Sequence, residues 1–365
     1  ALAQRTNQVA GAFARAGIGR EERVACLILD QIEYPEIFLG AMKGGIIPVA
    51  LNTLLSTSVY DAILRDSRAA CLMVSAELLE VVKPAISGNP WLRQVIVIGG
   101  DAPEDTLSYD TFMEGAPELG AIDVSADEGA FWLYSSGSTG TPKGVRHVHG
   151  SLQATADTFG RDVLGIREDD TVFSAAKMFF AYGLGNAMSF PMSVGATTVI
   201  FAGRPTPDGV QDVLTNHKPT IFCGVPTLFA AMVAATEAKG SAPDHALRLC
   251  TSAGEALPRE IGERWEWHWT APIVDGVGST EMLHIFLSNR PGDIVYGTSG
   301  TAVPGYEVKL VDEHDEDVPE GEVGELLVRG PSSAEGYWNR RHKSQSTFQG
   351  HWTRTGDKYE RTPEG

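Results

Sequence analysis

The chain has 365 residues, with 29 Lys and Arg against 47 Asp and Glu, so its formal net charge is −18. This charge argues against a general affinity for nucleic acid or for an anionic membrane surface, because both require basic patches that displace counterions. With 43% hydrophobic and 21% charged residues, the composition excludes a disordered chain and allows two or three ordinary domains.

The first residues form a pattern typical of an amphipathic helix, with Leu2, Val9 and Phe13 on one face and Gly17 after its end. The chain begins on this pattern with neither a Met nor a secretory signal, so we expect an upstream segment and a cytoplasmic protein. The cysteines lie in apolar runs without a CxxC pair, which predicts buried, reduced thiols. They are Cys26, Cys71, Cys223 and Cys250.

Short apolar runs alternate with amphipathic helical stretches over most of the chain. The apolar runs are residues 24–29, 46–50, 70–74, 94–98, 130–134, 171–175, 196–201, 220–225, 247–252 and 272–277. The helical stretches between them include residues 34–45, 58–68, 228–240 and 258–269. This alternation predicts parallel strands with right-handed crossovers, and so many strands predict two doubly wound α/β sheets.

Residues 178–203 are uncharged and long enough to span a bilayer, but glycines, prolines and polar residues interrupt them. We therefore expect no membrane span, and a buried loop, a short helix and a strand instead. From residue 296 the pattern changes, since the alternating runs 306–312 and 323–329 flank an acidic turn and predict an antiparallel hairpin. We expect an α/β layered core over residues 1–295 and a smaller β-rich subdomain over residues 296–365.

The most informative segment extends from Tyr134 to His147, where an apolar run leads into a loop of Ser, Thr, Gly and Pro around Lys143. Hydroxyls and close backbone N–H groups beside one ammonium group suit a polyphosphate. The loop is not a Walker loop, because Pro142 breaks the G-x-x-x-x-G-K-[ST] spacing and Gly144 follows the lysine. The segment predicts a phosphate-binding loop of another kind, with an ordinary surface turn as the alternative.

Six segments in fixed order resemble the adenylate-forming enzymes, which comprise acyl- and aryl-CoA ligases, peptide adenylation domains and luciferases. They are YSSGSTGTPKGV (134–145), FFAYGLGN (179–186), TSAGEALP (251–258), DGVGSTEM (275–282), GELLVRGPSSAEGYWN (324–339) and RTGDKY (354–359). Within that family, FFAYGLGN and STEMLHIFLSNR (279–290) are most similar to the benzoate-CoA ligase group. The resemblance covers nearly the whole chain.

The resemblance implies a nucleotide site built from several of these segments. Thr280 would contact the α-phosphate, Asp275 the edge of the adenine, and Asp357 the ribose hydroxyls, from which a carboxylate can accept two hydrogen bonds. The implied nucleotide-binding residues are Ser135, Ser136, Gly137, Ser138, Thr139, Gly140, Gly254, Glu255, Ala256, Asp275, Gly278, Thr280 and Asp357. The alternative for Asp357 is a purely structural role, in which its side chain caps a loop.

Elementary electrostatics points to a cation beside Glu281. Two unit charges about 4 Å apart interact by about 4 kcal/mol at an effective dielectric of about 20, so this carboxylate would repel a phosphate directly. Glu281 is therefore a sensible Mg²⁺ ligand, and the resemblance implies the same. The implied catalytic residues are Lys143, Thr280 and Glu281. Without the other segments, GSTE could equally be a helix N-cap with an early acidic residue.

Residues 179–186 combine aromatic and small side chains, which would form a flat slot better suited to a planar ring than to an alkyl chain. An aromatic core cluster is the alternative. Similarity to benzoate-CoA ligases implies that Ala181, Tyr182, Ala253, Gly278, His284 and Ile285 surround the ring or its carboxylate. Among them His284 stands out, because an imidazole can donate a hydrogen bond to a carboxylate.

Other conspicuous residues have less specific interpretations. Trp265, Trp267 and Trp269 alternate at the end of a helical stretch, where packing is expected over ligand stacking. Lys177 and Arg146 could add positive charge for a phosphate or lie on the surface. His147 and His149 lack a second ligand pair at metal spacing, which argues against zinc.

Together these features predict the large N-terminal domain of an AMP-forming aryl-CoA ligase that uses ATP, Mg²⁺, coenzyme A and an aromatic carboxylic acid. Benzoate is the expected acid, with hydroxy- or aminobenzoate, cyclohexanecarboxylate, cinnamate-type and fatty acids as alternatives. A catalytically silent nucleotide- or acyl-binding module is the rival from another class. The resemblance implies a small C-terminal domain that carries the family's adenylation lysine, and we expect that this piece, which ends shortly after Asp357, lacks it. We expect this piece to bind acid and adenylate but to turn over poorly; a homodimer is left open.

Overall fold

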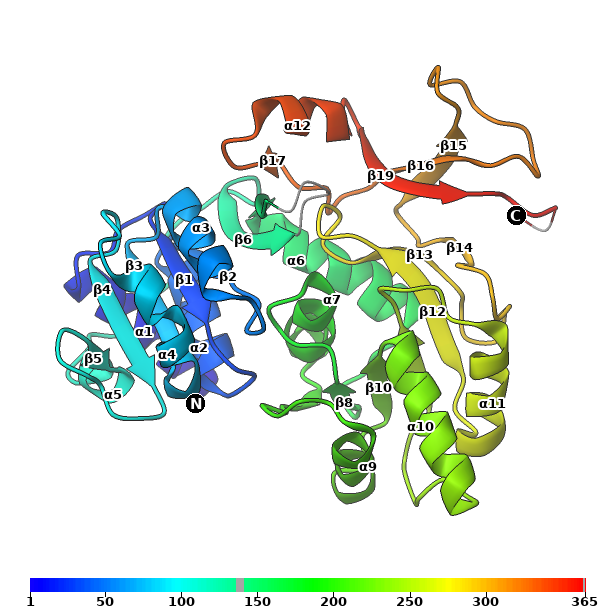
Figure 1. Ribbon diagram of the computed structural model, residues 1–365, viewed down its shortest axis with the longest axis horizontal. Coiled ribbons are helices and arrows are strands. Elements are labelled where there is room, and N and C mark those ends of the chain that lie inside the picture. Colours follow the sequence, from blue (N-terminus) through cyan, green and yellow to red (C-terminus); the bar gives the residue numbers. More distant parts are fainter. Residues whose placement is uncertain (136–140, 364) are drawn as a thin grey trace. The chain divides into compact units, whose positions relative to one another are not determined.

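The computed structural model describes residues 1–135, 141–363 and 365 (Figure 1). Its internal contacts define two compact units, residues 1–150 with 334–341 and residues 151–333 with 342–365. The division at residue 296 was expected from a change in the sequence pattern, whereas these units are defined by contacts, so that division stays a prediction. Among the described residues, no helix is long and apolar enough to cross a membrane.

The first unit is built on an eight-stranded sheet in the order β17-β7-β6-β2-β1-β3-β4-β5. The strands are β1 (Arg23–Leu27), β2 (Ile47–Ala50), β3 (Cys71–Ser75), β4 (Gln94–Ile98), β5 (Leu107–Ser108), β6 (Gly129–Ser135), β7 (Lys143–Val148) and β17 (Gly336–Tyr337). The strands from β6 to β5 in this order pair in parallel, whereas β7 pairs antiparallel with both β6 and β17.

Helices cover this sheet because each has one apolar stripe. They are α1 (Leu2–Arg15), α2 (Glu33–Lys43), α3 (Thr57–Ser67), α4 (Ala76–Ile86) and α5 (Tyr109–Met113), with α6 (His149–Thr155) after β7. Tyr60 and Leu64 of α3 and Val82 of α4 pack against Leu27 and Val74 of the sheet in one buried cluster. The sheet is thus covered by a helical layer, as its continuous apolar strands require.

The second unit contains a seven-stranded sheet in the order β14-β13-β12-β11-β10-β8-β9. The strands are β8 (Thr171–Ser174), β9 (Thr197–Val199), β10 (Ile221–Gly224), β11 (Leu249–Ser252), β12 (Ile273–Gly278), β13 (Ile285–Ser288) and β14 (Thr301–Ala302). β8 to β12 are parallel, and β13 and β14 continue the sheet antiparallel.

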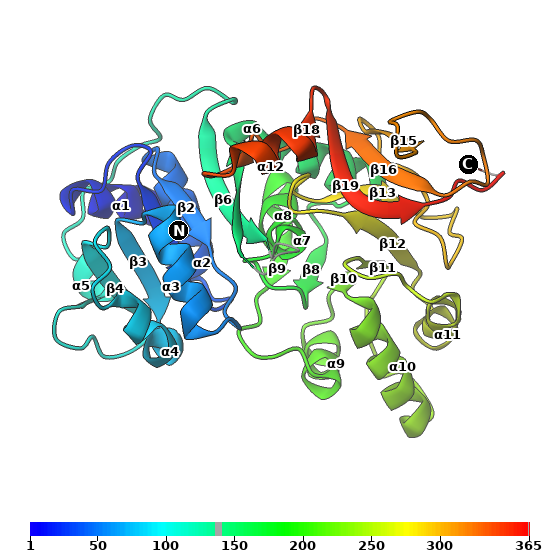
Figure 2. The same cartoon turned by 45° about the horizontal axis from the view of Figure 1, so that its top comes forward.

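Two buried clusters cover the faces of this second sheet. Its helices are η1 (Ala156–Val163), α7 (Ala181–Leu184), η2 (Gly185–Ser189), α8 (Phe190–Val194), α9 (Pro207–Asn216), α10 (Pro226–Lys239) and α11 (Arg259–Trp269), where η1 and η2 are π-helical. Residues of α9, α10 and α11 form one cluster with the sheet, and residues of η1 and α8 join the other. Figure 2 shows α9, α10 and α11 on the same side of β10 and β12.

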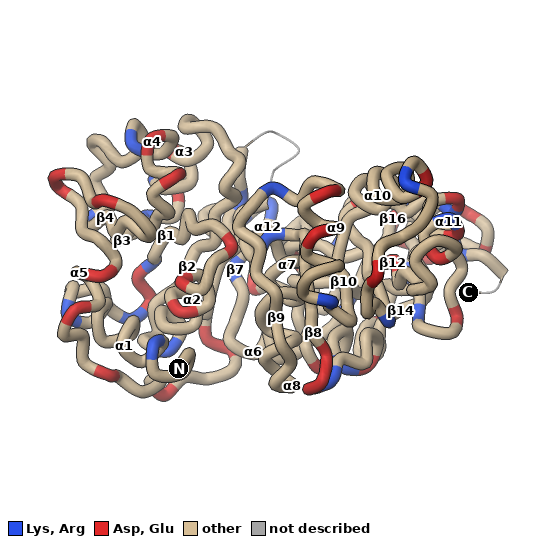
Figure 3. The backbone as a smooth tube through the Cα atoms, turned by 90° about the horizontal axis from the view of Figure 1, so that it is seen from below, with Lys and Arg blue, Asp and Glu red and all other residues tan. Residues whose placement is uncertain are grey.

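A small antiparallel sheet in the same unit has the order β15-β16-β19-β18. Its elements are β15 (Glu307–Val311), β16 (Gly324–Arg329), β18 (Phe348–Gln349) and β19 (Trp352–Tyr359), and α12 (Arg341–Thr347) precedes β18. The expected hairpin is confirmed, since Glu307 pairs with Arg329 and Val311 with Glu325. Figure 3 shows acidic residues spread over helices and loops of both units, interspersed with basic ones.

The expected α/β class with two doubly wound sheets is confirmed. The predicted apolar runs form strands of these sheets. The antiparallel strands β7, β13 and β14 were not foreseen. The four cysteines are buried and free, as expected.

The packing predicted for the three tryptophans on α11 is confirmed for Trp265 and Trp269 and is wrong for Trp267. Trp265 and Trp269 are fully buried and stack with ring centroids 4.6 Å apart, because residues four apart share a helix face. Trp267 points the other way and is 82% exposed.

A buried carboxylate fixes the start of β8. Asp170 is 1% exposed and accepts from Nε and Nη2 of Arg248 at 2.8 and 2.6 Å and from the Thr220 hydroxyl at 2.7 Å. Burial alone would raise the pKa of Asp170, but these bonds and the N–H of Arg167 lower it overall. The ionised carboxylate therefore stabilises the fold.

We predict that Asp170→Asn lowers the free energy of unfolding by about 3 kcal/mol at pH 7, since it leaves Arg248 without its partner. Because the pKa is lowered in the fold, this stabilisation is present above the ordinary value of 3.8 and is lost as the pH falls through the lowered value. Urea unfolding at several pH values measures this. Asp169→Asn is the matched control, because the Asp169 side chain is 77% exposed; equal effects of the two changes would contradict the prediction.

Candidate nucleotide and acid site

The candidate site in the second unit begins where β11 and β12 end. Ser252 of β11 and Asp275 of β12 are partners in the parallel register, so their carboxyl-terminal ends lie side by side. The loop after β11 carries Ala253, which is buried, followed by three exposed residues. These are Gly254, Glu255 and Ala256. Ligands of open α/β sheets bind at this edge.

Several buried polar atoms at this edge have no hydrogen-bond partner among the described residues. They are Thr251 Oγ1, Ser252 Oγ, Asp275 Oδ1 and His284 Nδ1. Leaving a buried polar atom unsatisfied costs about 1–3 kcal/mol, so native structures rarely tolerate several together. Polar groups of a ligand or water would satisfy them, which makes this the strongest geometric indication of a binding site.

Asp275 is the most perturbed acid of the site. It is 5% exposed, and burial raises its pKa to about 7, although the nearby Ser252 hydroxyl and the backbone amides of Leu257 and Gly276 act in the opposite direction. A buried carboxyl with such a pKa can donate as well as accept a hydrogen bond near neutral pH.

Thr280 and Glu281 lie in a tight turn between β12 and β13. The N–H of Met282 donates to Ser279 Oγ at 3.1 Å, and Leu283 has a φ of +64°, the left-handed region that a leucine rarely adopts. A Cβ on Gly278 would lie 2.5 Å from the carbonyl oxygen of His284, so only glycine fits there. The turn keeps both predicted side chains half-buried at the sheet edge.

Electrostatic coupling brings Asp357 into the same neighbourhood. Asp357 is an exposed residue of β19, and its pKa is raised by partial burial and by the charge of Glu281. The pKa of Tyr359 is raised mainly by burial and further by Asp357 and Asp275. The structure therefore brings together the carboxylates predicted for adenine, metal and ribose, while their roles stay predictions.

The predicted acid pocket centres on Tyr182 and His284. The Tyr182 hydroxyl donates to the Thr251 carbonyl at 2.9 Å, and His284 Nε2 lies 3.3 Å from the Tyr182 carbonyl. The His284 ring also packs on Phe159 and Phe190 at centroid distances of 5.0 and 4.6 Å. Ala181 begins α7, and Ile285 is buried at the start of β13.

The hydrogen bond to the Tyr182 carbonyl defines the state of the His284 ring. Burial lowers its pKa to about 3, so the ring is neutral. A carbonyl oxygen can only accept, so Nε2 carries the proton and Nδ1 is left as an acceptor. In this arrangement Nδ1 faces the site as an acceptor, and the donation to a carboxylate expected from the sequence stays a prediction.

Lys143 lies in the first unit, at the first position of β7. Ser135 pairs with Lys143 across the antiparallel strands β6 and β7. The loop residues Ser136, Gly137, Ser138, Thr139 and Gly140 lie outside the described residues. Lys143 Nζ is 4.8 Å from the ring centroid of Tyr337, within cation–π range. The sequence did not point to Tyr337, although it lies in a recognised segment.

Two suggested cations are engaged elsewhere. Lys177 Nζ donates to the carbonyls of Phe201 and Gly203, the latter at 2.7 Å, so its charge serves the backbone. Arg146 lies 4.0 Å from Glu335. Neither contact supports a phosphate role.

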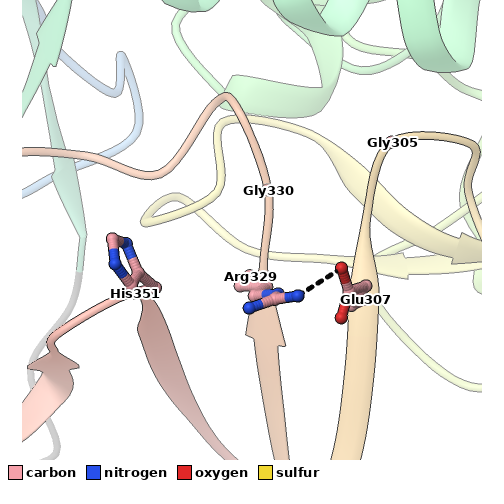
Figure 4. Close-up of a pocket in the computed structure, with 5 residues that line it drawn as sticks. All are labelled: Gly305, Glu307, Arg329, Gly330 and His351. Carbon is pink, nitrogen blue, oxygen red and sulfur yellow. Dashed lines mark hydrogen bonds and ion pairs between the residues drawn. The ribbon is translucent and has the colours of Figure 1, made fainter.

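A separate pocket of about 340 Å³ lies on the small sheet (Figure 4). It is lined by Gly305, Glu307, Arg329, Gly330 and His351, none of which was predicted as a site residue. Arg329 is ion-paired with Glu307 in the pocket. Its cation is thus already compensated, and the pocket is not part of the candidate site.

The fold and the sheet-edge site define an α/β ligand-binding protein with an acidic, partly buried site. Residues 1–338 match the model of the family "AMP-binding enzyme". The chain belongs to this family.

Three relatives illustrate the similarity. The chain is 50% identical to "Benzoate--CoA ligase" of Thauera aromatica, over 100% of this chain and 69% of that protein. It is 49% identical to "4-hydroxybenzoate--CoA/benzoate--CoA ligase" of Rhodopseudomonas palustris, over 97% and 65%. The solved benzoate CoA ligase of Burkholderia xenovorans LB400 matches with a TM-score of 0.94 and 47% identity, over 100% of this chain and 72% of that one. The chain thus spans about two thirds of these relatives.

We predict that Asp275→Asn flattens the pH dependence of stability of the ligand-free protein. Because the pKa of Asp275 is raised from 3.8 to about 7, the fold is stabilised at low pH and loses stability as the pH rises through 7. At about 1.4 kcal/mol per pKa unit, the difference between pH 4 and pH 8 is at most about 4 kcal/mol. Thermal unfolding across this range checks it; a variant as stable as the wild type at pH 4 and no more stable at pH 8 would contradict it.

We also predict that the Tyr337 ring holds Lys143 in place. Tyr337→Leu removes the ring face and should raise the KM for ATP about 3- to 10-fold, in line with a cation–π energy of about 0.5–1.5 kcal/mol. Tyr337→Phe keeps the ring and serves as the matched control. Pyrophosphate exchange kinetics distinguishes them, and an equal KM for both variants would count against the contact.

Proposed function

We propose that this chain is the acid- and nucleotide-binding part of an ATP-dependent, AMP-forming aryl-CoA ligase. The observation that carries the proposal is the set of unsatisfied buried polar atoms on Ser252, Asp275 and His284 at the edge of the second sheet. They lie beside the segments that resemble the family's nucleotide and acid sites. The identity of about 50% to benzoate-CoA ligases over the chain supports the same activity.

In the proposed first half-reaction, a carboxylate oxygen of the acid attacks the α-phosphorus of ATP, forming acyl-AMP and releasing pyrophosphate. The CoA thiol then displaces AMP and forms the thioester. Both reactants of the first step are anions, so the protein must neutralise charge and align them rather than supply a nucleophile. We assign this neutralisation to Lys143 and the alignment of the α-phosphate to Thr280.

The residues around Glu281 fit a bound Mg²⁺. The Glu281 charge acts on Asp357, so this part of the site holds negative charge that a cation would balance. Among the described residues no group of three His, Cys, Asp or Glu could hold a metal. A usual Mg²⁺ site needs only one or two protein carboxylates, because water and substrate phosphates complete it. When bound, Mg²⁺ supplies charge neutralisation at the phosphates, and Glu281 would hold it.

The proposed acid is benzoate or a close aromatic acid. Tyr182 is fixed through its hydroxyl to Thr251, and its ring lies 5.5 Å from that of His284. Two such rigid rings favour a planar substrate over a flexible one. A ring hydroxyl on the substrate requires a partner, because burying it unpaired costs about 1–3 kcal/mol. We further propose a cytoplasmic location, which the four free cysteines support.

A panel of acids in ATP–pyrophosphate exchange tests the proposal on the longest form of the protein that contains this chain. We expect benzoate to give the highest kcat/KM, with hydroxy- and aminobenzoates about 5- to 150-fold lower where the added group lacks a partner. Acetate and a long-chain fatty acid are the controls. Highest activity with a fatty acid would overturn the acid class, and no exchange with any acid would favour a silent binding module.

A further inference from the structure

In the segment GELLVRGPSSAEGYWN (324–339), only Tyr337 has been given a role so far, although the whole sequence of the segment is distinctive. Ser332 in this segment is fully buried. Its Oγ donates to the carbonyl of Met282 at 2.6 Å, and its oxygen lies 2.6 Å from the hydroxyl of Tyr306. A serine hydroxyl has one proton, so Tyr306 is the donor in the second bond. The chain of bonds therefore leads from Tyr306 through Ser332 to Met282.

The Met282 carbonyl belongs to the turn that carries Thr280 and Glu281. Leu283 in this turn has a φ of +64°, which costs a leucine about 1–2 kcal/mol. Such a conformation persists only where its surroundings determine it. The bond from Ser332 and the bond from the Met282 N–H to Ser279 Oγ hold the turn from two sides.

The surroundings of Tyr306 are built for this contact. A Cβ on Gly330 would lie 2.1 Å from the Tyr306 ring, so the ring rests directly on a glycine of the same segment. Tyr306 is 6% exposed, and it belongs to the cluster that includes Met282 and Leu326. Packing thus fixes the ring and holds its hydroxyl against Ser332, with Thr158 as a second polar neighbour of that hydroxyl.

We propose that Tyr306 and Ser332 are positioning residues that hold the Ser279–Leu283 turn so that Thr280 reaches the α-phosphate of a bound nucleotide. The inference rests on the proposed function. His284 lies just beyond the turn, but three aromatic rings and the Tyr182 carbonyl hold it independently. Loss of the Ser332 bond should therefore affect the phosphate end of the site and leave the acid end unchanged.

The test compares the binding of AMP, adenosine and benzoate by calorimetry, without metal, to the wild type, Ser332→Ala and Tyr306→Phe. AMP and adenosine differ only in the phosphate that Thr280 would contact. We expect both variants to lose about 3- to 10-fold in affinity for AMP, the effect of one neutral hydrogen bond, and to stay within about twofold for adenosine and benzoate. Ser333→Ala is the matched control, because its hydroxyl contacts Thr353 instead, at 2.9 Å.

The outcomes separate the inference from the proposed function. Unchanged AMP affinity in both variants, or equal losses for AMP and adenosine, would overturn the positioning role. If the wild type binds neither nucleotide nor benzoate, the proposed function fails, and the inference fails with it. Should Ser332→Ala not fold, Tyr306→Phe decides alone, since it removes one oxygen and keeps the ring.

Discussion

The parallel pairing of β11 with β12 is the constraint on which the candidate site depends. It sets Ser252 beside Asp275 on two buried strands, where Ser252 Oγ and Asp275 Oδ1 are buried without a hydrogen-bond partner among the described residues. Burial then raises the pKa of Asp275. The same register also sets the positions of the residues that follow Asp275 along the chain. A slip of the register by one residue would turn these side chains to the opposite face of the sheet.

The negative charge of the chain is also found locally, at this edge of the second sheet. Asp275 influences Tyr359, and Glu281 influences Asp357, so three carboxylates share one electrostatic neighbourhood. An anionic ligand can enter such a place only with compensating cations. Two basic residues of the second unit are engaged elsewhere, because Lys177 is bound to backbone carbonyls and Arg248 to Asp170. The negative charge shared by these carboxylates is the physical reason why a divalent cation on Glu281 belongs to the proposed function.

The sequence was sufficient for the strands because both faces of each sheet are covered, which makes the strands continuous apolar runs. It was insufficient for β7, whose mixed residues lack that pattern, and for β13, a buried apolar run of four residues directly after the turn. The site residues could be proposed because ligand-binding loops need unusual residues, such as the glycines around Asp275. The direction of the His284 proton could not be foreseen, since it depends on a backbone carbonyl more than a hundred residues away in the chain.

The same reasoning explains why residues 324–339 carried a recognisable pattern but no predicted role. A serine, a tyrosine and a glycine that act through hydrogen bonds and packing have no chemistry that composition or spacing could identify. Their role can be recognised only from the atom that they hold in the fold, which is the carbonyl oxygen of Met282. A left-handed leucine between the predicted metal ligand and the acid pocket must be held by something, and a buried hydroxyl supported by a fixed ring meets that need at small cost in volume. The strained turn and the distinctive residues of a segment distant in sequence are therefore linked, because the segment holds the turn in its strained conformation.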